Sequence, residues 1–138
     1  MAAHPRLLHT VLDAVDVRRE AEFWRELLGL VYRAGDEVPP EGPAADDADW
    51  LVLTHPDGRR CLAVQQVAEQ PRSTWPSQDV PQQLHLDLTV TDLAELAAQH
   101  DRAVALGATV LLDRTDDPDE PLWVLADPEG HPFCIFVG

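Results

Sequence analysis

The sequence carries one arrangement of landmarks twice, and this repeat constrains the fold more than any other feature. In each half a histidine precedes an aspartate by seven positions. A glycine then follows the aspartate after thirteen positions in the first half and fifteen in the second. Because the same order of features recurs, we infer an internal duplication of roughly 60–75 residues. The landmarks are His9, Asp16 and Gly29 in the first half, and His85, Asp92 and Gly107 in the second.

Local patterns predict a βαβββ unit in each half. Asp16 and Asp92 precede apolar residues at helical spacing and are typical helix N-caps, and the glycines mark the helix ends. The first half is expected to hold a strand over 7–15, a helix over 17–28, and strands over 30–33, 50–54 and 60–67. The second is expected to hold a strand over 84–90, a helix between Asp92 and Gly107, and strands over 108–112, 122–126 and 133–137. The buried side of the second helix is expected to include Leu93, Leu96, Ala97, Ala103, Val104 and Leu106.

These elements predict an α+β fold of tandem modules within one domain over 1–138. The modules are expected to span 5–68 and 83–138. The net charge of −15 argues against nucleic acid as a partner, because phosphate binding needs a cationic surface. No apolar run approaches the roughly 20 residues that a membrane helix needs. The cysteines lack paired spacing and the N-terminus lacks a secretion signal, which favours a cytoplasmic location. The acidic excess fits either a solvated coat or attraction of a cationic ligand.

Three stretches carry a family resemblance: HTVLDAVDVRREAEFWRELLGL, HLDLTVTDLAELAAQHDRAVALGATV and VLADPEGHPFCIFV. They resemble the vicinal oxygen chelate superfamily, which includes glyoxalase I, bleomycin-resistance proteins and extradiol dioxygenases. More narrowly, the chain is similar to glyoxalase-like proteins of actinobacteria. The resemblance implies that each module curls its mixed sheet into half of a cup, with a ligand or metal between the concave faces. It also implies a homodimer.

Strand alternation indicates which side chains face the cup. With His9 inward, Val11 and Asp13 share its side and Leu8 and Leu12 face the helix. By the same alternation, Asp87 and Thr89 lie with His85, and Phe136 lies with Cys134. In metal-dependent relatives the ligands come from the first and last strand of each half, which implies His9, Gln65 or its neighbour Gln66, His85 and Cys134 here. An amide and a thiol therefore stand where the resemblance calls for carboxylates.

Three functions follow as hypotheses. The first is binding of a small organic molecule in the cup between the modules, beside a degenerate metal site. The second is a divalent-metal lyase, isomerase or dioxygenase with zinc, nickel, iron or manganese on His9 and His85, and with Asp13 or Asp87 as added ligand or base. The third is a resistance protein that sequesters a cationic drug. The connector's Trp75 is expected to form a mobile aromatic rim. The expected ligand contacts are His9, Asp13, Gln65, Trp75, His85, Asp87 and Cys134.

Overall fold

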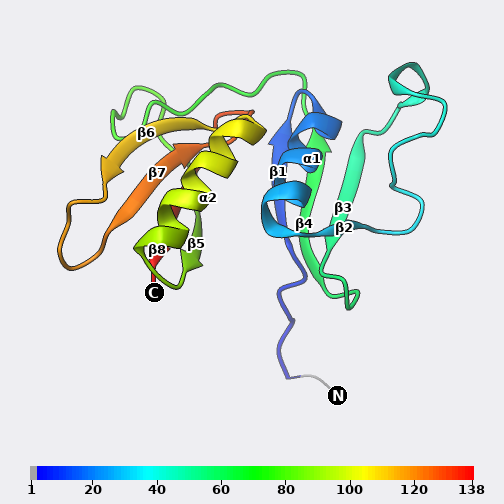
Figure 1. Ribbon diagram of the computed structural model, residues 1–138. Helices are drawn as coiled ribbons and strands as arrows, with labels where there is room; N and C mark the ends of the chain where they lie inside the picture. The colour runs from blue at the N-terminus through cyan, green and yellow to red at the C-terminus, as the bar shows by residue number, and fades with distance from the viewer. Residues whose placement is uncertain (1–2) are drawn as a thin grey trace. The chain divides into compact units, whose positions relative to one another are not determined.

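The computed structural model describes residues 3–138 and divides the chain after Glu69 into two compact units. Within the described residues, each unit pairs one α-helix with a four-stranded mixed sheet (Figure 1). The α+β class and the two βαβββ units predicted from the repeat are confirmed. The connector after Glu69 belongs to the second unit. Neither α-helix in this part of the chain is long and apolar enough to span a membrane.

The first unit has the sheet order β1-β4-β3-β2. Strand β1 runs parallel to β4, and the remaining neighbours are antiparallel. A short 3₁₀ helix, Pro43–Ala45, interrupts the long loop between β2 and β3. The elements are β1 (Thr10–Ala14), α1 (Val17–Leu28), β2 (Val31–Tyr32), β3 (Trp50–Thr54) and β4 (Arg60–Gln66).

The second unit repeats this topology with the order β5-β8-β7-β6. Strand β5 runs parallel to β8, as β1 does to β4. The recurrence of one parallel pair beside antiparallel neighbours is the structural form of the sequence repeat. The elements are β5 (Leu86–Val90), α2 (Leu93–Leu106), β6 (Thr109–Arg114), β7 (Leu122–Ala126) and β8 (Pro132–Val137).

Both helices begin at the predicted aspartate caps. The Asp16 carboxylate accepts a hydrogen bond from the Arg19 backbone N–H at 3.1 Å. The Asp92 carboxylate accepts one from the Glu95 N–H at 2.8 Å. These bonds satisfy amide groups that the first helical turn leaves without a partner. Gly29 ends α1 with a φ of 66°, a left-handed conformation that a residue without a Cβ adopts at little cost.

Strand β1 is shorter than predicted, because the chain before Thr10 has no partner on the neighbouring strand. The β1–β4 register starts with Thr10 opposite Leu62. Leu8, expected to face the helix, is instead 61% exposed. The alternation holds within the strand, since Leu12 and Ala14 are buried while Val11 on the opposite face is exposed.

Helix α2 buries a narrower face than its apolar residues predict. Leu96 and Ala103 are buried, and they lie about two turns apart on one stripe of the helix. Leu93 and Val104, expected on the buried side, are 60% and 42% exposed, and Ala97 is also exposed. Two small or medium side chains suffice for this contact because Phe133 and Ile135 of β8 supply the larger buried apolar groups.

Candidate ligand site

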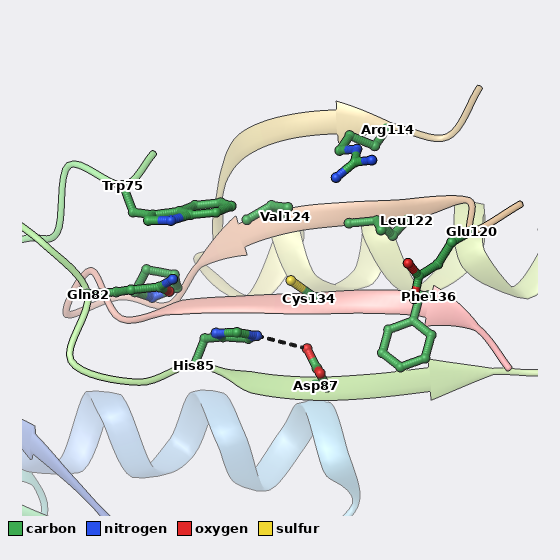
Figure 2. Close-up of a pocket in the computed structure, with 11 residues that line it drawn as sticks. Trp75, Gln82, His85, Asp87, Arg114, Glu120, Leu122, Val124, Cys134 and Phe136 are labelled. Carbon is green, nitrogen blue, oxygen red and sulfur yellow. Dashed lines mark ion pairs between the residues drawn. The ribbon is translucent and has the colours of Figure 1, made fainter. Parts of the chain in front are cut away.

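The second unit contains a cavity of about 230 Å³ on one face of its sheet. Alternation along β8 explains the placement: Phe133 and Ile135 are buried on one face, while Cys134 and Phe136 line the cavity on the other. Figure 2 shows the Trp75 indole and the Cys134 sulfur facing this space. The apolar lining residues are Trp75, Leu122, Val124, Pro132 and Phe136; the polar ones are Gln82, His85, Asp87, Arg114, Glu120 and Cys134.

The connector holds Trp75 at the pocket through hydrogen bonds within its own loop. The Ser73 hydroxyl accepts a hydrogen bond from the backbone N–H of Trp75 at 3.1 Å and donates one to the Val80 carbonyl at 3.1 Å. The Thr74 N–H donates to the same carbonyl at 2.8 Å, and the Thr74 hydroxyl accepts from the Val80 N–H at 2.9 Å. Trp75 is therefore presented by a closed hydrogen-bonded loop, in a segment for which the sequence predicted a mobile rim.

Arg72 ties this loop to the rest of the second unit. Its guanidinium donates to the Pro128 carbonyl at 2.8 Å and to the Thr109 hydroxyl at 3.3 Å. Its side-chain stem and backbone lie against Gly130 in the turn between β7 and β8. A long side chain that is fixed at both its stem and its head holds the position of the segment that carries it.

One wall of the pocket gathers three different donor atoms. His85 Nε2 lies 3.2 Å from Asp87 Oδ1, as the dashed line in Figure 2 marks. Cys134 lies directly opposite Asp87 in the β5–β8 ladder. One donor atom from each of these three residues lies within 4.8 Å of the other two. Burial, with the negative charge and hydrogen bond of Asp87, raises the pKa of the Cys134 thiol to about 11.

The charged groups around this pocket are mainly negative. Asp87 and Glu120 contribute carboxylates, and Arg114 contributes one guanidinium. That guanidinium is already engaged by Asp117, at 3.0 Å. The two carboxylates therefore outnumber the one guanidinium, whose charge Asp117 partly offsets, and this balance favours a positively charged group at the pocket. Sequence reasoning missed Arg114 and Glu120, because both fall in the loop expected between the strands over 108–112 and 122–126; the structure instead extends β6 to Arg114.

The first unit places Asp13 and Gln65 side by side. The Gln65 amide donates to Asp13 Oδ1 at 3.0 Å, and the two residues are partners in the β1–β4 ladder. Gln66 is the partner of Ala14, whose side chain is buried. Of the two glutamines left open by the sequence, the register therefore puts Gln65 on the strand face shared by Asp13 and His9.

The two ladders also show that Gln65 and Cys134 do not occupy matching positions. Cys134 lies opposite a residue two places after its histidine, whereas Gln65 lies opposite Asp13, four places after His9. The first-unit residue that matches Cys134 is Ala63, opposite Val11. The first unit thus offers a methyl group where the second offers a thiol, which the spacing in the sequence could not reveal.

His9 lies in surroundings of the opposite sign from those of His85. It is half-buried, its ring centroid is 6.1 Å from that of Trp50, and its buried Nδ1 has no hydrogen-bond partner among residues 3–138. Burial lowers the pKa of His9, and the positive charges of Arg60 and Arg33 lower it further. The same charges oppose a divalent cation at His9.

The metal implied by the resemblance therefore fits the two units differently. The first unit has arginines near His9 and Ala63 at the last-strand position, so its residues do not fit a cation. In the second unit an imidazole, a carboxylate and a thiol converge, and this donor set suits a borderline-soft ion such as zinc. Bound there, such a cation would polarise an oxygen atom of a ligand.

Comparisons with known proteins place most of the chain in one family. Residues 9–136 match a family described as a glyoxalase-like domain. No curated protein matches the chain at a significant level.

Solved structures share the fold at low sequence identity. A glyoxalase/bleomycin resistance protein/dioxygenase family enzyme from Burkholderia phytofirmans PsJN is 15% identical, with a TM-score of 0.66 over 94% of this chain and 96% of that one. The fosfomycin resistance protein FosX from Mesorhizobium loti is 14% identical, with a TM-score of 0.65 over 100% of this chain and 94% of that one. A lactoylglutathione lyase from Agrobacterium tumefaciens is 21% identical, with a TM-score of 0.60 over 96% of this chain and 93% of that one. At these identities the likeness shows the fold alone.

Proposed function

This chain belongs to the glyoxalase-like domain family, and we propose that it binds a small organic molecule carrying a positive charge in the pocket of the second unit. The observation that supports this most is the pocket itself. It joins an apolar lining and a loop-held Trp75 to the carboxylates of Asp87 and Glu120. A mostly apolar cavity with a few placed polar groups is the usual form of a small-molecule site.

The sign of the charge selects the ligand class. A cation near Asp87 and Glu120 gains from both carboxylates, while Arg114 is engaged by Asp117. A cation can also interact with the electron-rich face of the Trp75 indole. The chain's net charge of −15 supports the approach of such a ligand from solution.

Binding is favoured over a glyoxalase-type reaction because the carboxylates that the resemblance implies are absent. Cys134 occupies the last-strand position in the second unit, and Ala63 occupies the matching position in the first. The predicted ligand contacts in the first unit, His9, Asp13 and Gln65, are not among the residues that line this pocket. Backbone amide NMR signals of these three residues, with the imidazole signals of His9, test their predicted role in a ligand titration.

Three matched probes test the ligand class: 2-phenylethylamine, 2-phenylethanol and phenylacetate, titrated by calorimetry and NMR. We expect the amine to bind most tightly and phenylacetate least. Trp75→Ala should weaken binding of all three, because it removes a wall of the pocket. Asp87→Asn should reduce only the preference for the amine. Affinity for the amine should fall as salt rises, because salt screens exposed charges.

Trp50→Phe, in the first unit, is the control for a tryptophan substitution outside the pocket. The proposal would be refuted if no probe shifted the pocket signals, or if Trp75→Ala and Trp50→Phe had equal effects. Equal affinity for the amine and the acid would refute the charge preference while leaving small-molecule binding in place.

A further inference from the structure

The imidazole, carboxylate and thiol on the pocket wall can together bind a metal ion, a property that binding of an organic cation does not use. We propose that His85, Asp87 and Cys134 form a site for a thiophilic divalent cation, zinc or cadmium, contained within the second unit. The site differs from the metal site that the family resemblance implies, in which both His9 and His85 bind one ion, because it uses neither His9 nor any other residue of the first unit.

The strand register brings the donors together. Asp87 and Cys134 are partners in the parallel β5–β8 ladder, and His85 precedes Asp87 by two residues on the same side of the chain. The donor atoms lie within 4.8 Å of one another. Around one zinc ion, with bonds of about 2.0–2.3 Å, such atoms lie roughly 3–4 Å apart. Small rotations of side chains that face an open pocket close this difference.

The donor set determines which cation is preferred. A thiolate is a soft ligand, which favours zinc or cadmium over magnesium, calcium or manganese. With Cys134 as thiolate, Asp87 as carboxylate and His85 neutral, the ligands carry two negative charges against the two positive charges of the ion. Binding releases the thiol proton of Cys134 to solvent, as metal–thiolate formation requires.

The surroundings of the site add a second line of support. The Glu120 carboxylate lines the same pocket and acts electrostatically on Cys134, and this attraction for a cation outweighs the opposing effect of Arg114, which is the smaller of the two on the thiol. The opposite holds at His9, where Arg60 and Arg33 act on the imidazole. The cation and an organic amine would both use Asp87, so the inference predicts that zinc and 2-phenylethylamine compete.

Cobalt(II) is a direct probe, because a cobalt–thiolate bond gives a charge-transfer absorption band in the near ultraviolet. Metal-free, tag-free protein is titrated with Co²⁺, and zinc or cadmium is then added to displace it. We expect one Co²⁺ per chain, a thiolate band, full displacement by zinc or cadmium, and no displacement by excess Mg²⁺.

Four variants locate the site. Cys134→Ser should abolish the band. Asp87→Asn and His85→Gln should each weaken zinc affinity by about 100-fold or more, at or above the upper end of the roughly 10–100-fold that loss of a hydrogen-bond partner behind a metal ligand costs. Cys61→Ser is the matched control, since it removes the other thiol of the chain and should leave the band intact. Circular dichroism of each variant checks that it is folded, and His85→Gln keeps the thiol if Cys134→Ser does not fold.

Each outcome decides between readings. A band that persists in Cys134→Ser, or that never forms in folded wild-type protein, overturns the inference. A band lost in His9→Ala overturns the claim that one unit suffices. The proposed function is tested separately by 2-phenylethylamine binding to metal-free wild-type protein, which does not depend on the outcome of the cobalt titration.

Discussion

Gly130 and Gly58 are matched glycines whose replacement by alanine should have different consequences. They end the DPEG and HPDG turns, with φ angles of 92° and 90°. The backbone N–H of each glycine donates a hydrogen bond to the carbonyl of the residue three places before it, at 2.9 Å in both turns. An alanine is strained in either position by about 1–2 kcal/mol, because its Cβ disfavours positive φ.

The spaces around the two glycines separate them. A Cβ at position 58 meets nothing within 4 Å. A Cβ at position 130 would lie 2.9 Å from the Arg72 side chain and 3.0 Å from its Cα. Because a backbone atom is involved, the connector itself must shift. Overpacking of this kind costs about 1–3 kcal/mol, so Gly130→Ala should be less stable than Gly58→Ala by about that amount.

The same shift should reach the ligand pocket, since Arg72 lies three residues before Trp75. We therefore expect Gly130→Ala to weaken binding of 2-phenylethylamine, and Gly58→Ala to leave it unchanged. Urea unfolding measures the stability difference, and calorimetry measures the affinities. Equal loss of stability in the two variants, with unchanged affinity in both, would refute the reasoning that Arg72 positions the Trp75 loop.

Three further predictions concern the rest of the chain. Asp16→Ala and Asp92→Ala should each cost about 1 kcal/mol in urea unfolding, because each removes a helix cap; no loss would contradict the cap assignment. The hydrogen bond from Arg18 holds the pKa of Asp46 below its usual value of 3.8. The ionised Asp46 therefore stabilises the fold above pH 3.8, and this contribution should be lost as the pH falls through the lowered pKa. Asp46→Asn should remove this part of the pH dependence of the free energy of unfolding. By NMR, the His9 ring should titrate below pH 6.5, because burial and the nearby arginines disfavour its protonated form. Protonation of His9 at low pH should therefore destabilise the folded state. A titration midpoint above 6.5 would contradict this explanation.

The sequence by itself was sufficient for the repeat, the α+β class, both helix caps and the order of the strands. These features depend on local spacing: aspartates before apolar helical residues, glycines after them, and alternation along LHLDLTV. The same alternation correctly placed Cys134 and Phe136 on one face of the last strand and Phe133 and Ile135 on the other.

What the sequence could not provide was the pairing between strands and the charge around each histidine. Ala63, rather than Gln65, matches Cys134, because register depends on how two distant strands align. Arg33 and Arg60 act on His9, whereas Glu120 lines the pocket at His85, although the two histidines hold the same place in the repeat. Tertiary structure decided this difference, because the electrostatic environment of a side chain is set by residues remote in sequence.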